Sequence, residues 1–126
     1  MNISDESKQN VLNNLLRDVW HVSNKEYQRR IWIEGRGPEC DDYDETSIGI
    51  LDDGEVVIKE PKHLEMTDEQ YCILKAFWNA YEQFSHGIGM EYYIPERFID
   101  TEEWTRVTEM AKEVIKAFDY CYKHRS

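Results

Sequence analysis

The chain has 126 residues, of which 26 are acidic and 15 are basic, so its formal net charge is -11 at pH 7. A chain of this length is expected to form a single domain over residues 1–126, and its 13% aromatic residues can supply a core without disulfides. The acidic excess argues against nucleic acid and anionic membrane surfaces as partners, because both repel a negatively charged protein.

The first predicted helix covers residues 5–20. Its apolar residues recur at steps of three and four, which places them on one side of a helix. They are Val11, Leu12, Leu15, Leu16 and Val19. The polar residues between them, such as Arg17 and Asp18, are expected to lie off that side.

A second helix is predicted over residues 24–34. Ser23 and Glu26 have the spacing of a capping box, and Gly35 suits the left-handed end of a helix. A strand is the alternative for this segment, because a second set of apolar residues falls on alternate positions: Tyr27, Ile31 and Ile33. The capping signals favour the helix.

The segment 46–59 has two interpretations. Asp53-Gly54 is the preferred dipeptide of a two-residue hairpin turn, Gly49 weakens a helix, and Val56 to Ile58 favour a strand. Alternatively, the residues from Asp42 to Glu45 cap a short helix that reaches about Leu51. The sequence favours the hairpin over the helical turn.

Two further helices are predicted, over residues 68–85 and 101–122. A capping box at Thr67 to Gln70 precedes the first, and Asp100 or Thr101 caps the second. Pro95 begins a single turn between them that ends at Phe98. The predicted fold is therefore mainly α, a small α+β arrangement of about four helices with a short hairpin or helical turn near residues 46–59.

The charge is concentrated between Glu39 and Glu55, where eight acids occur without one Lys or Arg. The rest of the chain is close to balance, with 18 acids against 15 bases. One interpretation is a docking surface for a basic protein, since complementary charge speeds encounter and sets register. The alternative is a solvated segment that keeps a hairpin soluble. The candidate partner-binding residues are Glu39, Asp41, Asp42, Asp44, Glu45, Asp52, Asp53 and Glu55.

Aromatic side chains give a second set of candidate contacts. Tyr43 lies within the acidic stretch, and Tyr92 and Tyr93 are adjacent in a segment bounded by glycine and proline. The remaining aromatics have helical spacing, which is more typical of a core than of a binding surface.

Motifs for catalysis and metal binding are missing from the sequence. Asp42 and Asp44 alternate, but no glycine or closing glutamate follows at the spacing of a calcium loop. Glu82 and His86 share a helix side, yet two ligands alone do not make a metal site. No nucleophile motif, phosphate loop or dinucleotide fingerprint occurs. We therefore predict no catalytic residue, metal or cofactor, which favours a binding protein over an enzyme.

Cysteine usage indicates a reducing compartment. Cys40, Cys72 and Cys121 are odd in number, widely spaced and without a CxxC pair. Cys72 and Cys121 are expected to pack near the apolar stripes of their helices. The polar N-terminus does not read as a signal peptide, and no apolar run is long enough to span a bilayer. The expected location is cytoplasmic.

Several sequence blocks resemble a group of short, uncharacterised bacterial proteins. In size and charge this group is similar to immunity proteins, which protect bacteria from their own or neighbouring toxins. The resemblance implies a binding role and brings no catalytic residue with it. The blocks are Ser23 to Gln28, Gly37 to Glu39, Tyr43 to Glu45, Thr67 to Tyr71, Pro95 to Thr101 and Met110 to Val114.

The leading hypothesis is a small acidic protein that neutralises or regulates a basic protein partner. A toxin effector such as a nuclease is the first candidate, because an acidic surface can occupy the cationic groove that binds phosphates. The alternative is a small enzyme or ligand-binding domain with a pocket between the C-terminal helices, converging on Glu82, His86 or Tyr93. A third option is self-association through exposed aromatic side chains.

Overall fold

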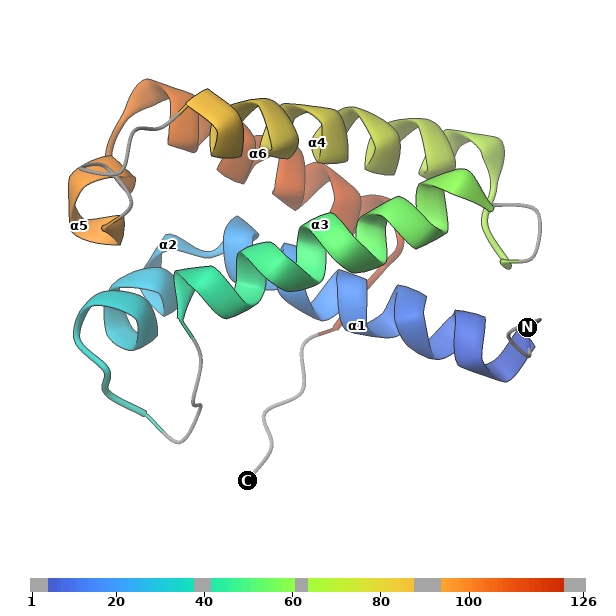
Figure 1. Cartoon of the computed structure of the whole chain (residues 1–126), viewed down its shortest axis with the longest axis horizontal. Helices are drawn as coiled ribbons and strands as arrows, with labels where there is room; N and C mark the ends of the chain where they lie inside the picture. The colour runs from blue at the N-terminus through green and yellow to red at the C-terminus, as the bar shows by residue number, and fades with distance from the viewer. Residues whose placement is uncertain (1–4, 38–41, 61–63, 88–93, 122–126) are drawn as a thin grey trace.

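The computed structural model describes residues 5–37, 42–60, 64–87 and 94–121, and all regular structure in these ranges is helical (Figure 1). The elements are α1 (Asp5–Ser23), α2 (Lys25–Tyr27), the π-helical segment η1 (Gln28–Ile33), α3 (Tyr43–Lys59), α4 (Asp68–Gly87), α5 (Pro95–Phe98) and α6 (Glu102–Ala117). The mainly α prediction is confirmed, and the described part of the chain contains no strand.

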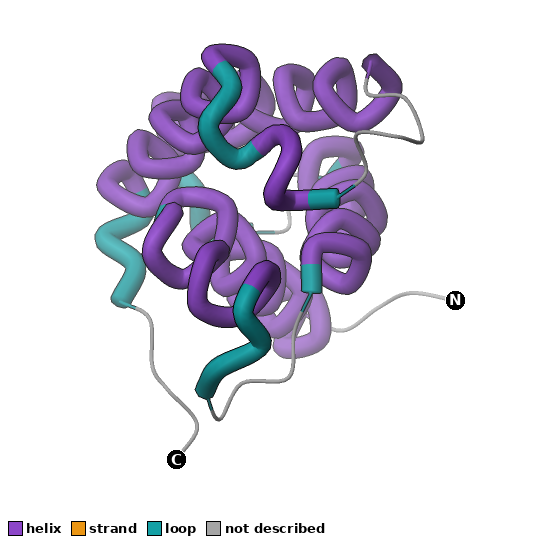
Figure 2. The backbone as a smooth tube through the Cα atoms, turned by 90° about the vertical axis from the view of Figure 1, so that its left-hand side faces the viewer, coloured by secondary structure: helices purple, strands orange, loops and turns teal. Residues whose placement is uncertain are grey.

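The four long helices form a ring in which each helix packs against two neighbours. α1 contacts α3 and α6, and α4 contacts the same two helices. α3 and α6 therefore lie across the bundle from each other, with α3 in front of α6 in Figure 1. The short elements α2, η1 and α5 cover one end of the bundle, where α5 packs on η1 (Figure 2).

The helices predicted over residues 5–20 and 68–85 are confirmed as α1 and α4. The apolar stripe of α1 is buried from Leu12 to Val22, which carries the helix slightly past its predicted end. The capping box of α4 is formed by two reciprocal hydrogen bonds. The Gln70 N–H donates to Thr67 Oγ1 at 3.0 Å, and the Thr67 N–H donates to Gln70 Oε1 at 2.8 Å.

The helix predicted over residues 101–122 is α6, which ends earlier than expected. Thr101 is its N-cap and accepts a hydrogen bond from the Trp104 N–H. At the other end, Asp119 adopts a positive φ of 49°. The Tyr120 N–H then donates to the carbonyl of Ile115 at 3.0 Å, which is the 6→1 bond of a Schellman motif. This left-handed end stops the helix at Ala117.

The segment predicted as a helix over residues 24–34 is helical, which excludes the strand alternative. Its cap differs from the prediction, because the Asn24 side chain accepts from the Tyr27 N–H while Ser23 Oγ donates to the Trp20 carbonyl. The helix then widens into the π-helical η1, and the Glu34 N–H donates to the Arg29 carbonyl at 2.9 Å. Gly35 ends the segment with a φ of +64°, as predicted.

Gln28 joins the end of α1 to α6 from inside the core. Its side chain is fully buried, and its Nε2 donates to the carbonyls of His21 and Val22, both at 2.8 Å. Its Oε1 accepts from the Trp104 indole N–H at 2.9 Å. One amide therefore satisfies buried polar groups from two helices, which would otherwise destabilise the core.

The hairpin predicted within residues 46–59 is wrong, because the whole segment belongs to α3. Asp42 caps this helix by accepting a hydrogen bond from the Glu45 N–H at 2.8 Å. Gly49 and Gly54, which suggested turns, instead allow close helix contacts. A Cβ at Gly49 would overlap the Asp18 carboxylate of α1, and one at Gly54 would overlap the Trp78 indole of α4. The glycines thus serve packing between helices.

Aromatic rings fill the end of the core that α5 covers. Trp104 is fully buried, with ring centroids 4.8 Å from Phe98 and 5.0 Å from Phe84. Tyr43 and Tyr81 add edge contacts to the same indole at about 6 Å. Phe98 belongs to the short turn that was predicted to start at Pro95. This turn reverses the chain and also contributes a residue to the core.

We predict that Gly54→Ala destabilises the protein by about 1–2 kcal/mol, although alanine is the better helix former by about 1 kcal/mol. The reason is the overlap of the new methyl group with the Trp78 indole ring. Urea unfolding measures the change. Gly87→Ala is the matched control, because nothing lies within 4 Å of a Cβ there. A Gly54→Ala variant as stable as the control would contradict the packing role of this glycine.

We further predict that Gln28→Leu lowers the free energy of unfolding by about 2–4 kcal/mol, because it leaves the Trp104 N–H without its acceptor inside the core. Gln83→Leu makes the same chemical change at an exposed position of α4 and should have little effect. Denaturant unfolding of both variants checks the prediction, and equal stability losses would count against it.

Candidate functional site

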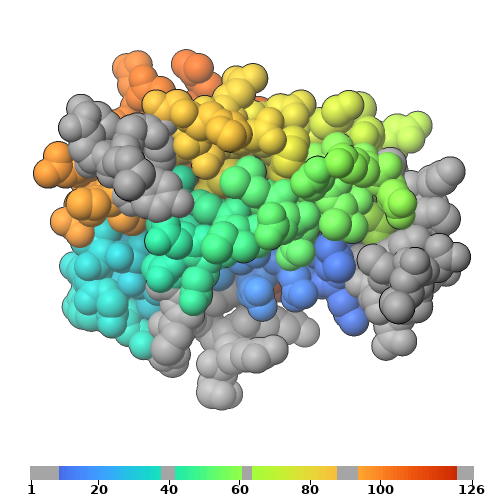
Figure 3. Space-filling view, in the orientation of Figure 1, coloured from blue at the N-terminus to red at the C-terminus, as the bar shows by residue number. Residues whose placement is uncertain are grey.

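The solvent-facing side of α3 carries four exposed carboxylates. They follow helical spacing on α3, which lies across the face of the molecule turned to the viewer in Figure 3. We call this set the acidic face, and its members are Asp44, Glu45, Asp52 and Glu55. Glu55 accepts from Lys59 Nζ at 2.5 Å, one turn further on. The other three form no ion pair with any residue that the structure describes.

Two exposed apolar side chains lie on the same side of α3. Ile48 is 62% exposed and Val56 is 42% exposed. Helical spacing places Ile48 between the carboxylates and Val56 at the C-terminal edge of the set, and single apolar residues scattered on a surface need no explanation. Two of them within one charged helix side have the composition of a small interface, with an apolar centre and a polar rim.

The other predicted acids are placed differently. Asp42 is the N-cap of α3, so its carboxylate has a structural role at the edge of the acidic face. Asp53 is partly buried on the side of α3 that faces Arg17 of α1. Glu39 and Asp41 fall outside the described residues. The structure therefore brings half of the eight predicted acids together on one exposed side.

The electrostatics of Asp53 reflect this inward position. Burial raises the pKa of its carboxyl above the ordinary value of 3.8, and the neighbouring charge of Asp52 raises the pKa further. The Arg17 guanidinium opposes both effects by stabilising the charged form. Asp53 thus carries a charge that the folded state disfavours, in contrast to the exposed carboxylates beside it.

The aromatic candidates do not join this site. Tyr43 is buried, with its ring 4.9 Å from that of Phe98, so it belongs to the core. Burial raises the pKa of its hydroxyl above 10.0, and the nearby hydroxyl groups of Ser47 and Tyr81 partly offset the rise. Tyr92 and Tyr93 lie outside the described residues.

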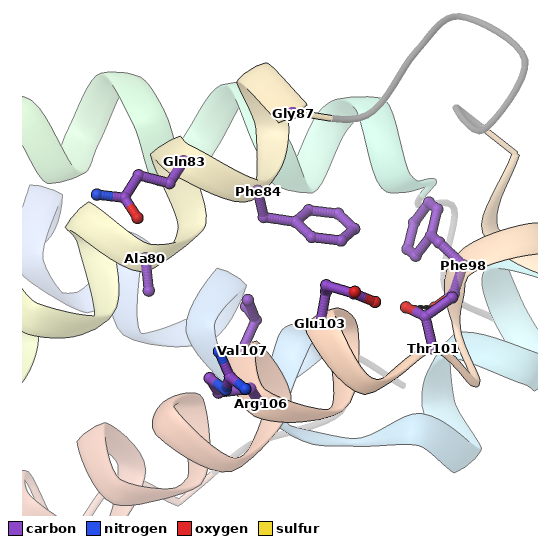
Figure 4. Close-up of a pocket in the computed structure, with 9 residues that line it drawn as sticks. All are labelled: Ala80, Gln83, Phe84, Gly87, Phe98, Thr101, Glu103, Arg106 and Val107. Atoms are coloured by element: carbon purple, nitrogen blue, oxygen red, sulfur yellow. Dashed lines mark hydrogen bonds between the residues drawn. The ribbon is translucent and has the colours of Figure 1, made fainter.

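A cavity of about 530 Å³ lies between α4 and α6, where the alternative hypothesis expected a pocket (Figure 4). Its lining residues differ from those expected. Neither Glu82 nor His86 lines it, and Tyr93 is outside the described residues. The lining consists of Ala80, Gln83, Phe84, Gly87, Phe98, Thr101, Glu103, Arg106 and Val107.

A buried polar cluster connects α1 and α3, and the sequence did not reveal it. Asp18, expected on the exposed side of its helix, is 6% exposed and lies 3.8 Å from His21 Nδ1. The Thr46 hydroxyl approaches the same ring nitrogen at 3.3 Å. Both contacts are made to the same ring nitrogen, and they join α1 to α3 inside the structure. In the sequence, this cluster is indicated only by Asp18 and His21, which lie three residues apart within the apolar stripe of α1.

Other sites considered in the sequence are not formed by the described residues. Among these residues, no group of three or more His, Cys, Asp or Glu side chains is placed to hold a metal ion. Cys72 and Cys121 are exposed rather than packed in the core, and Cys40 lies outside the described ranges. Within the same ranges, no helix has both the length and the apolar character that crossing a membrane requires.

We predict that Asp53→Asn stabilises the protein at neutral pH. A carboxyl whose folded pKa is raised binds protons more tightly when folded, so its contribution to stability falls as pH rises through that raised value. The advantage of the variant should therefore shrink as pH falls toward 3.8. Thermal unfolding over this range measures it, with Glu113→Gln as a control for net charge. A gain that is independent of pH would argue against the burial effect.

The chain was compared with protein-family models, with curated proteins and with solved structures. None of the three comparisons finds a match. The acidic face and the cavity between α4 and α6 are therefore the features from which a function is inferred, together with the physical chemistry of their residues.

Proposed function

We propose that this chain is a small acidic binding protein that neutralises or regulates a basic protein, and that the acidic face of α3 is the docking surface. The observation that carries the proposal is the row of exposed carboxylates at Asp44, Glu45 and Asp52, which no base in the described part of the chain pairs with. Their mutual repulsion is relieved when a cationic surface approaches.

The geometry of the row suits electrostatic steering. Residues 44 to 55 span about 16 Å along a helix axis, at 1.5 Å per residue. Screening limits each charge to a reach of roughly 8 Å at physiological salt, so Asp44 and Glu45 reinforce each other in one half of the face, as do Asp52 and Glu55 in the other. Clustered charge of this kind raises association rates by about 10- to 1000-fold.

Ile48 and Val56 would contribute to the lifetime of the complex. Burial of apolar surface contributes about 25 cal/mol per Å², while exposed ion pairs contribute at most about 1 kcal/mol each. The carboxylates therefore govern the encounter and its salt dependence, and the two apolar side chains govern dissociation.

The first candidate partner is a basic toxin effector. The similarity of the resembling bacterial proteins to immunity proteins, in size and charge, supports this class. A nuclease is the most suitable member of it, because the groove that binds phosphates is cationic and complements a row of carboxylates. Blocking such a groove would neutralise the enzyme without any catalytic residue in the inhibitor.

Two variants with equal charge changes test the proposal. The first combines Asp44→Asn, Glu45→Gln and Asp52→Asn on the acidic face. The second combines Glu102→Gln, Glu109→Gln and Glu113→Gln on α6, across the bundle from α3. All three proteins serve as bait in lysate of the producing cell. A basic protein should be retained by the wild type and by the α6 variant, and lost or strongly reduced with the α3 variant.

Kinetics with the recovered protein then give the decisive measurement. The association rate should fall by about tenfold or more for the α3 variant, with a flatter dependence on salt, and should change less for the α6 variant. Equal rates for the two variants would reject the acidic face as the docking surface.

A further inference from the structure

The cavity between α4 and α6 is a second candidate site, and none of its lining residues comes from α3. Its volume of about 530 Å³ is within the range of small-molecule sites, which is roughly 300–1,000 Å³. The cavity does not depend on the acidic face, and the inference drawn from it is independent of the basic protein partner.

Two phenylalanine rings line the cavity, and Phe84 is the more accessible of the two because Phe98 is only 2% exposed. Phe84 and Phe98 meet edge to face, with centroids 5.4 Å apart. Both rings also contact the buried Trp104 indole, which holds them in place. Ala80 and Val107 add small apolar surfaces beside them (Figure 4). The site therefore presents prearranged aromatic rings rather than a loose apolar surface.

The polar groups around the rings favour positive charge. Figure 4 shows the Glu103 side chain extending toward the two phenylalanines, while Arg106 lies on the other side of Val107. Neither side chain has an ion-pair partner among the described residues. The last turn of α4 ends at Gly87, beside the cavity, and a helix C-terminus carries a partial negative charge.

Several features of the cavity disfavour the binding of an anion. The N-terminus of α6 has a partial positive charge, but Glu102 and Glu103 already occupy its first turn. The faces of aromatic rings are negative, and the chain as a whole carries a net charge of -11. The two carboxylates, the ring faces and the net charge repel a carboxylate or phosphate and attract a cation, whereas the α6 N-terminus and the lining residue Arg106 act in the opposite direction.

We propose that this cavity binds a small organic cation, namely a primary ammonium or guanidinium group on an aromatic or short aliphatic body. The charged group lies between the Glu103 carboxylate and the partly exposed ring of Phe84, with Phe98 packed behind that ring, and is held by charge pairing and cation–π attraction. The apolar body packs against Ala80 and Val107. The occupant is a free small molecule, because the volume suits a whole compound of this type.

Three probes of one shape test the charge preference. They are 2-phenylethylammonium, 3-phenylpropionate and 2-phenylethanol, which differ mainly in the charge of the terminal group. Each is titrated into the ¹⁵N-labelled full chain, and amide shifts are followed by NMR. The ammonium should give saturable shifts at the end of α4 and the start of α6, and should bind more tightly than the other two.

Two matched variants locate the counter-ion. Glu103→Gln should weaken ammonium binding by about fivefold, the scale of one exposed ion pair. Glu102→Gln removes the same charge from the same helix turn, but residue 102 does not line the cavity, so binding should weaken clearly less than with Glu103→Gln. Thermal unfolding confirms that both variants are folded.

Several results would overturn the proposal. Tighter binding of the propionate, lost in Arg106→Gln, would make the cavity an anion site. Equal affinity for all three probes would show that the pocket is purely apolar. If no probe shifts the amide signals, the cavity is a gap in the packing and not a binding site. None of these outcomes involves the basic partner, so failure here leaves the proposal for the acidic face standing on its own test.

Discussion

The close packing of α3 between α1 and α4 is the constraint on which the rest of the structure depends. Gly49 lies against Asp18 of α1, and Gly54 lies against Trp78 of α4. Because these contacts occupy the two flanks of α3, the rotation of the helix is fixed, and its remaining side faces solvent. The carboxylates of that side share one exposed surface only because α3 is packed in this orientation. The indole N–H of Trp78 also donates to the Ile50 carbonyl, which secures the same contact.

The parts of the fold that follow local rules were predictable from the sequence. The apolar stripe of α1 and the capping box at Thr67 depend on residues within one or two helical turns. The error at α3 arose because Asp53-Gly54 and the valines after it have local strand and turn preferences, whereas contacts with other helices decide the outcome. The bridging role of Gln28 had no local signal, because its partners are helix-end carbonyls and a distant indole.

The candidate sites were partly predictable for the same reason. The sequence located the acidic stretch but could not identify its exposed members, since a hairpin and a helix turn different residues outward. It also anticipated a cavity between the C-terminal helices. The core residues Leu74, Phe77 and Tyr81 set the rotation of α4, and this rotation leaves Glu82 and His86 outside the cavity.

The position of Trp104 gives the molecule an intrinsic optical reporter. Its indole is fully shielded from water, touches the rings of Phe84 and Phe98 on one side and donates to Gln28 on the other. The other three tryptophans, Trp20, Trp32 and Trp78, are partly exposed. We therefore expect Trp104 to give the shortest-wavelength component of the native fluorescence, and expect this emission to report both on a compound bound between α4 and α6 and on loosening of the π-helical turn.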